Sequence, residues 1–369
     1  MRKLHTAYKV FDAAAAICIA VLIVWAAYAK FGGEYGSVLI AASLVLGGLV
    51  CSFLCDVLHE AGHLLFGKIC NFSFNSVRVG FVKIYKKDGY IRVTAKDLPE
   101  SVAGATEMLP RNSEKLYPRF LWTVAGGLFF SFLAFAALFA CFLFYRRLPF
   151  AVFALTCTGL PYAFHLFFYN LLPLDNDSLF TDGAIFWGLL HKDASYRTAV
   201  NILAVEGYLN EGLAPAEIDA ELYFGLPQLP EDDINFIILT SYRLMYYLDA
   251  DDKAKAVAAC ERLESLMEYV PEYYEKDIAS DILFCECSLN GDAALAESMY
   301  PALATHLLRE DTLASHRILA AYELYVNGDK TAALSHVNEA QKKAETHQIP
   351  GLVKYEKKLL ARIRGDLAR

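Results

Sequence analysis

The stretch that decides the fold is residues 37–70, SVLIAASLVLGGLVCSFLCDVLHEAGHLLFGKIC. It is long and apolar enough to cross a bilayer as a helix, because one span takes about 20 apolar residues. Near its end stands His59-Glu60-Ala61-Gly62-His63. On a helix this spacing places both imidazoles on one face, one turn apart, where both can bind a single zinc ion. Glu60 then lies beside the metal as a general base.

Two buried histidines on a core helix are the ordinary alternative for this pattern. However, an ionisable glutamate flanked by two histidines at membrane depth is costly unless it has a role. We therefore interpret His59 and His63 as zinc ligands and Glu60 as the catalytic base of a metal-dependent hydrolase.

Three further stretches, residues 10–29, 120–145 and 150–172, also have the length and composition of a span. Together with the stretch quoted above, they predict an all-α polytopic membrane protein with about four transmembrane helices. The first stretch could instead be a signal peptide, because basic residues precede it and small residues end it. Its length, and Trp25 and Tyr28 as interface anchors, favour a retained span.

Composition divides the chain into two halves. Apolar residues make up 56% of the chain and charged residues 21%, and the mean hydropathy is +0.31. Residues 1–191 carry 16 Lys+Arg against 12 Asp+Glu, whereas residues 192–369 carry 18 against 30. The acidic second half is unlike the basic surfaces that bind nucleic acid, so we expect no such partner. The nine cysteines lack framework spacing and predict free thiols.

The placement of lysine and arginine predicts the orientation in the membrane. Three basic residues precede the first span, and ten lie between Lys68 and Arg119. Because cytoplasmic loops carry the excess of positive charge, we expect a multi-pass protein of the cell membrane with its N-terminus in the cytoplasm. The loop at residues 68–119 and the C-terminal half then lie on the same side.

A small β-hairpin insertion is expected at about residues 71–100, directly after the histidine motif. Residues 73–97 alternate between apolar and polar side chains, and Lys87-Asp88-Gly89 has the composition of a hairpin turn. An exposed edge of this hairpin could pair with an unwound substrate segment as an added strand. Alternatively, the hairpin only packs on the ends of the helices.

A catalytic zinc site needs a third protein ligand, because such sites hold three protein groups and a water. Asp182 is our choice for this ligand, with Gly183 allowing a tight backbone turn next to the metal. Asp175 and Asp177 are the alternatives.

Two more residues near the end of the fourth span are candidates for substrate positioning. Pro173 would break the helix and expose backbone groups near the site. Asn170 could donate hydrogen bonds to a substrate carbonyl group. Taken alone, an Asn-x-x-Pro sequence would only mark the end of a helix, but its pairing with the histidine motif favours a functional role.

The combination resembles the site-2 protease family of intramembrane zinc metalloproteases. The resemblance covers about residues 37–191 and rests on the His59–His63 motif, Ala125-Gly126-Gly127 on the middle span, and Asn170, Pro173 and Asp182-Gly183 after a later span. It implies Zn²⁺ as cofactor and a membrane protein or peptide as substrate. Two departures are the longer, polar link at residues 174–181 and the lack of an Asn after the glycine motif, where Phe130 or Ser131 stands.

A non-catalytic membrane scaffold with a structural or vestigial metal site is the main alternative. Such a protein would bind partners through its C-terminal half. The intact Glu60 favours the protease, because a purely structural metal site needs no base.

The C-terminal half predicts a soluble helical domain. Residues 192–233 read as a linker with irregular helices, and residues 234–369 as a tetratricopeptide-like domain. Three similar segments start at Leu248, Leu289 and Val326, with spacings of 41 and 37 residues. These spacings are near the ~34 of tetratricopeptide repeats. An irregular helical bundle is the alternative. A repeat array would offer a surface for a protein partner.

Overall fold

The protein forms two compact units. The membrane unit comprises Met1–Lys86, Tyr90–Met108 and Lys115–Asp193, and the helical unit comprises mainly Leu109–Glu114 and Ala194–Arg369. The computed structural model describes residues 2–87, 90–95, 104–173, 175–176 and 179–369.

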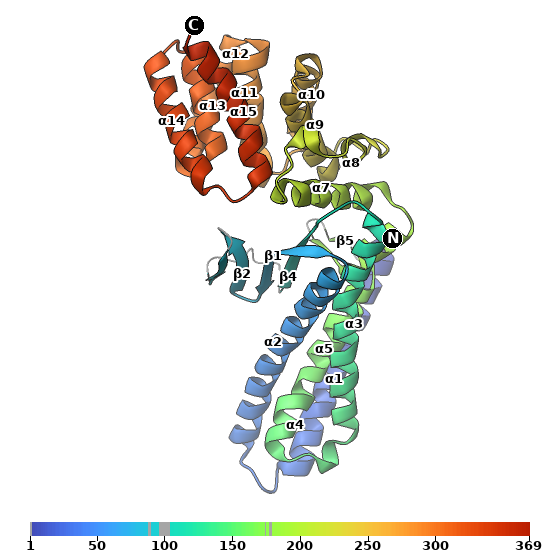
Figure 1. Ribbon diagram of the computed structural model, residues 1–369. Coiled ribbons are helices and arrows are strands. Elements are labelled where there is room, and N and C mark those ends of the chain that lie inside the picture. Colours follow the sequence, from blue (N-terminus) through green and yellow to red (C-terminus); the bar gives the residue numbers. More distant parts are fainter. Residues whose placement is uncertain (1, 88–89, 96–103, 174, 177–178) are drawn as a thin grey trace. The chain divides into compact units, whose positions relative to one another are not determined.

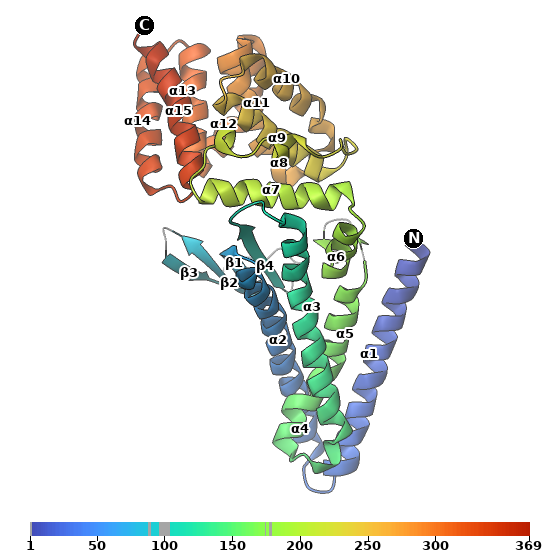
Figure 2. The same ribbon diagram turned by 45° about the vertical axis from the view of Figure 1, so that its right-hand side comes forward.

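Four of the described helical segments are long and apolar enough to cross a membrane, as the sequence predicts. They are α1 (Arg2–Phe31), α2 (Ser37–Ile69), α3 (Leu116–Leu143), and α4 (Phe150–Thr156) continued through a 3-10 turn by α5 (Leu160–Leu171). Figures 1 and 2 show these helices side by side. At 1.5 Å per residue α2 is about 50 Å long, which exceeds the ~30 Å of the hydrocarbon core. The sidedness of the spans stays a prediction.

Close backbone contact holds the spans together. A Cβ atom on Gly62 of α2 would lie 2.3 Å from the carbonyl oxygen of Gly126 on α3. Similarly, a Cβ atom on Gly47 would lie 1.9 Å from the carbonyl oxygen of Ala154 on α4. Lipid tails are as apolar as the side chains, so helices in a membrane associate through such close packing of small residues. These glycines therefore fix where α2 crosses its neighbours.

Two acidic side chains within the spans have polar partners. Asp12 of α1 is 2% exposed, and its Oδ2 lies 2.5 Å from Nδ1 of His165 on α5. The Tyr162 hydroxyl of α5 donates to Asp56 of α2 at 2.6 Å. Ionisable groups inside a membrane are tolerated when they are paired in this way. The two contacts tie α1 and α2 to α5.

A four-stranded sheet follows α2 in the part of the chain that the structure describes. Its order is β3-β2-β1-β4, and its strands are β1 (Phe72–Val79), β2 (Val82–Lys87), β3 (Tyr90–Thr94) and β4 (Gly104–Pro110). β1 and β2 are antiparallel, with Val79 opposite Val82. Their turn contains Gly80, whose φ of +52° favours glycine.

The sheet is larger than the predicted insertion at residues 71–100. β4 extends to Pro110, and β1 and β2 form a hairpin that the sequence analysis did not place. β4 lacks the alternation of a half-buried strand, and its neighbour β1 is distant in the sequence, so no local pattern marks it. Of the expected turn, Asp88 and Gly89 lie outside the described residues.

The helical unit is built largely of antiparallel helices. Much of the segment predicted as a linker is helix α7 (Ala194–Asn210), whose buried residues belong to this unit. The later helices are α8 (Glu221–Phe224), α9 (Ile234–Asp249), α10 (Lys253–Ser265), α11 (Glu272–Cys285), α12 (Ala293–Glu310), α13 (Leu313–Tyr325), α14 (Lys330–Thr346) and α15 (Pro350–Leu367).

The three similar segments of the sequence are turns between helices. Asp292 and Asp329 of the second and third segments cap α12 and α14, and Asp252, which follows the first segment, caps α10; each accepts hydrogen bonds from backbone N–H groups of the first turn. Gly291 and Gly328 precede two of these caps with positive φ. The turns therefore lie where the sequence places them, whereas the tetratricopeptide-like array stays a prediction.

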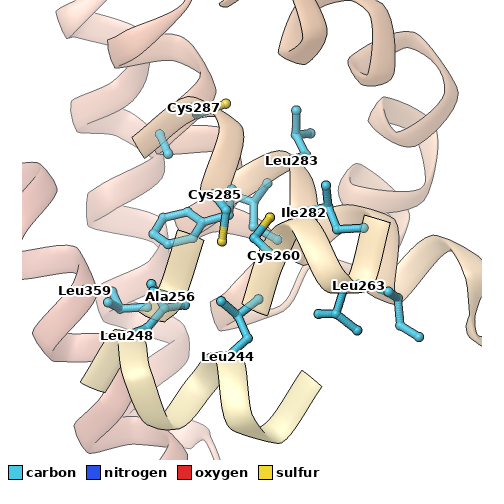
Figure 3. Packing of buried hydrophobic residues seen from close by; sticks show 14 of the residues in the cluster. Leu244, Leu248, Ala256, Cys260, Leu263, Ile282, Leu283, Cys285, Cys287 and Leu359 are labelled. Atoms are coloured by element: carbon cyan, nitrogen blue, oxygen red, sulfur yellow. The ribbon is translucent and has the colours of Figure 1, made fainter. Parts of the chain in front are cut away.

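The core of the helical unit contains unpaired thiols. Figure 3 shows Cys260 and Cys285 among Leu263, Ile282 and Leu283. All nine cysteines of the chain are free, as expected from their spacing. Buried free cysteine behaves as a small hydrophobic residue, so these thiols contribute to packing.

A buried charge network crosses the same core. Arg317 of α13 is 1% exposed, and its Nε donates to Glu356 of α15 at 2.6 Å. Its Nη2 lies 3.5 Å from Asp281 of α11. The guanidinium also lies over the Phe284 ring, 4.0 Å from the ring centre. One side chain thus connects three helices of the unit.

Replacing this arginine is expected to destabilise the helical unit strongly. Arg317→Met leaves Glu356, which is 6% exposed, as a buried charge without its arginine partner. Breaking such a pair costs about 3–5 kcal/mol. Thermal unfolding of the full chain in detergent checks this, with exposed Arg309→Ala as control. The double variant Arg317→Met/Glu356→Leu should recover much of the loss, and a single variant as stable as wild type would contradict the expectation.

Candidate metal centre

His59 and His63 meet on one face of α2, as the motif predicts. Their Nε2 atoms are 3.2 Å apart, and their rings are nearly perpendicular. Asp182 is the first residue of α6 (Asp182–Leu190). Its Oδ2 lies 3.2 Å from Nε2 of His59 and 3.2 Å from Nε2 of His63. Among the described residues, these three form the group that could hold a metal ion.

The geometry of the three atoms fits a small divalent cation. In a tetrahedral site, ligand atoms 3.2 Å apart lie about 2.0 Å from the metal, which is the usual zinc–nitrogen distance. Oδ2 of Asp182 is buried and accepts no well-formed hydrogen bond within the described part of the chain. The three ligand atoms therefore converge on one point, where a single cation can bind all of them. The residues present fit zinc.

Contacts behind the rings hold both imidazoles in a ligand-ready form. Nδ1 of His63 lies 3.0 Å from the carbonyl oxygen of Thr123 on α3. A carbonyl oxygen only accepts, so Nδ1 carries the hydrogen and Nε2 is the atom left to bind a metal. Nδ1 of His59 lies 2.7 Å from the hydroxyl of Ser131, which is 1% exposed. Such partners orient metal-binding histidines.

The glycine motif on α3, Gly126-Gly127, makes room for the imidazole ring of His63. A Cβ atom on Gly127 would lie 2.2 Å from Nε2 of His63. Its neighbour Gly126 contacts Gly62, within the histidine motif itself. The motif therefore lets α3 approach α2 closely enough for Thr123 and Ser131 to reach the two histidines.

Gly127→Ala is expected to displace the His63 ring and to weaken zinc binding by at least about tenfold, the lower end of the losses seen when the surroundings of a ligand are disturbed. Gly48→Ala is the matched control on α2, because its Cβ atom would lie 3.8 Å from the nearest Thr158 atoms. Zinc competition with a chelator measures both variants in detergent. Equal affinity of Gly127→Ala and wild type would contradict this geometry.

The end of α5 positions Asp182. The Thr181 hydroxyl donates to the carbonyl oxygen of Leu172 at 2.6 Å and accepts from the Ala184 N–H at 3.2 Å as the cap of α6. A Cβ atom on Gly183 would lie 2.3 Å from the carbonyl oxygen of Leu171. Gly183 therefore lies in the first helical turn, in close contact with α5, and not in the tight turn that we expected.

The charge state of Asp182 suits a ligand. Burial alone would raise its pKa, but the positive charge of a protonated His63 beside it in the metal-free protein outweighs burial, and the pKa lies below its ordinary value. The carboxylate is therefore ionised at neutral pH. Its place in the first turn of α6 also puts a negative charge where the helix dipole favours it.

The other candidates lie just before Asp182 in the chain, at the end of α5 and in the link that follows it. Asn170 donates from Nδ2 to the carbonyl oxygen of Leu166 within α5, at 3.1 Å. Pro173 follows the end of α5 and is exposed. Asp175 lies in a short strand that pairs with residues 179–180, and Asp177 lies outside the described residues. The substrate-positioning roles of Asn170, Pro173 and Gly183 stay predictions.

Glu60 lies beside the ligands and is 4% exposed. The Thr106 hydroxyl of β4 donates to its Oε2 at 2.6 Å. A Cβ atom on Gly104 would lie 2.2 Å from its Oε1. The sequence predicts the role of Glu60 but not those of Thr106, Thr123 and Ser131, because a single hydroxyl or backbone carbonyl has no spacing pattern.

Comparison with protein-family models, with curated proteins and with solved structures found no match to this chain.

Proposed function

We propose that the protein is an intramembrane zinc metalloprotease that hydrolyses a peptide bond in or near a transmembrane segment of a substrate protein or peptide. The observation that supports it is the convergence of His59, His63 and Asp182 at 3.2 Å, at one end of an apolar helix that also holds Glu60. A structural site would not need a buried carboxylate beside the ligands.

In this proposal His59, His63 and Asp182 hold Zn²⁺, which when bound supplies an activated water and polarises the scissile carbonyl group. Glu60 accepts the proton of that water on a carboxylate oxygen and passes it to the nitrogen of the leaving amine. Ser131 and the Thr123 carbonyl group hold the two imidazoles in place. Burial of the site excludes competing water and strengthens each charge interaction.

A substrate must reach this site with its backbone free. The peptide groups of a transmembrane helix are hydrogen-bonded within the helix, so a substrate segment would unwind before cleavage. An unwound segment can pair with the edge of a sheet as an added strand. The sheet that follows α2 offers such an edge on the same unit as the ligands.

The wider setting follows from the same proposal. The enzyme lies in the cell membrane, with its N-terminus and helical unit in the cytoplasm, and its substrate is a membrane protein or peptide. The helical unit binds a protein partner, while nucleic acid is not among the expected partners, because Ala194–Arg369 is rich in acidic residues.

One observation favours the alternative of a non-catalytic scaffold with a structural metal site. Both carboxylate oxygens of Glu60 are in contact with β4, through Thr106 and Gly104, which leaves the base covered. A scaffold would keep its metal but would have no need of Glu60.

Membrane proteomics of cells that express wild type or Glu60→Gln tests the proposal. The protease predicts that at least one uncut membrane protein with a single span accumulates in the variant. Glu34→Gln, at an exposed position between α1 and α2, is the matched control and should resemble wild type. Identical membrane proteomes for wild type and Glu60→Gln would favour the scaffold.

A further inference from the structure

Residues near the start of β4 cover Glu60, the proposed base. Thr106 donates to Oε2 of Glu60 at 2.6 Å. On the other oxygen, the backbone at Gly104 lies so close that a Cβ atom would be 2.2 Å from Oε1. Glu60 is only 4% exposed, and both of its carboxylate oxygens are in contact with β4. Glu60 cannot act as a base while β4 is in this position.

β4 also takes the strand position beside β1. The sheet order is β3-β2-β1-β4, so β4 is the edge strand on the β1 side. A side-chain contact supports the pairing, because the Ser76 hydroxyl of β1 donates to Glu107 of β4 at 3.1 Å. β1 begins three residues after α2 ends. The edge nearest the metal helix, where an extended substrate would pair, is therefore filled by the protein's own chain.

We propose that β4 is an autoinhibitory strand that covers Glu60 and must leave both Glu60 and β1 before a substrate can bind in its place. This inference rests on the proposed proteolytic function. It accounts for the covered base, because the structure then represents the closed form of an enzyme and not a site without activity. The substrate would enter as an extended segment that replaces β4 along β1.

The far end of β4 belongs to the other unit. Leu109–Glu114 groups with the helical unit. There the Ser113 N–H donates to the Tyr208 hydroxyl at 2.9 Å, and a Cβ atom on Gly207 would lie 2.0 Å from the carbonyl oxygen of Pro110. The covering strand and the segment bound to α7 are thus one continuous piece of chain.

Removing the Thr106 hydroxyl should loosen the cover. Thr106→Val loses a hydrogen bond to a charged group, and we expect cleavage of the substrate found by proteomics to rise about tenfold. Hydrogen exchange of residues 104–110 should also become faster, which is a measure that needs no substrate. Thr106→Ser keeps the hydroxyl and should remain near wild type. A fall in cleavage by Thr106→Val, or no change, would overturn the proposal, since Thr106 would then position the base or be irrelevant.

A disulfide lock tests whether β4 must leave. The pair Ser76→Cys/Glu107→Cys joins β1 to β4, and we expect cleavage below a tenth of wild type when it is oxidised, with recovery in dithiothreitol. Each single variant under the same oxidant controls for the nine native thiols. Full activity of the locked protein would overturn the proposal. If wild type and Thr106→Val both bind zinc but neither cleaves any substrate, the proteolytic function itself fails.

Discussion

Glu60→Gln lowers the rate of peptide cleavage by about 10²–10⁴-fold while zinc content stays at the wild-type level, because an amide of the same shape cannot accept a proton. The Thr106 hydroxyl can still donate to the amide oxygen, so the fold around residue 60 should persist. Separating metal content from activity is what distinguishes a base from a ligand.

The measurement uses purified full-length protein in detergent, with cleavage followed by mass spectrometry and zinc by elemental analysis. Exposed Glu34→Gln serves as the control for loss of one carboxylate. A variant at residue 60 that cleaves at the wild-type rate would exclude Glu60 as the base and leave the scaffold as the better account.

Asp182→Ala is expected to weaken zinc binding by more than about 100-fold, because even residues that only orient a ligand contribute 10–100-fold. Its Oδ2 is the third corner of the 3.2 Å triangle. The loss should also remove cleavage, since His59 and His63 alone leave the site incomplete.

Competition with a zinc chelator across three aspartate variants tests this ligand set. Asp175→Ala and Asp177→Ala are the comparisons, because both residues compete for the same role in the sequence. A ligand set of His59, His63 and Asp182 predicts wild-type affinity for these two and loss for Asp182→Ala alone. If Asp177→Ala lost zinc affinity while Asp182→Ala kept it, the third ligand would be Asp177, in the link at residues 174–181.

The sequence predicts those parts of the site that have a local period. His59 and His63 are one helical turn apart, so their convergence follows from the helix, and the apolar length around them predicts the span. The role of Asp182 is harder to predict, because the link at residues 174–181 does not fix how far Asp182 lies from the two histidines. Only the need for a third ligand and the resemblance to a known family singled it out, and the structure brings it to the histidines.

The contacts that position these residues have no such period. Thr106, Thr123 and Ser131 each contribute one hydroxyl or carbonyl group from a distant element, so only the packing of α2, α3 and β4 shows their roles. The sequence does not predict β4 for the same reason: its partner strand β1 is distant in the sequence, so no local pattern marks the pairing.

In the helical unit the same distinction holds. The turns were predictable, because Asp and Gly fix caps and left-handed backbone locally. The extent of α7 was not, because its sequence mixes apolar and polar residues, and its burial depends on the other helices of the unit.

Elemental analysis of purified, folded wild-type protein is the most direct test of the metal centre formed by His59, His63 and Asp182. We predict one zinc ion per chain after zinc repletion, and much less than one in the His63→Ala and Asp182→Ala variants. Wild-type protein that remains folded yet holds no stoichiometric divalent metal after repletion would contradict the metal centre and, with it, the proposed hydrolysis.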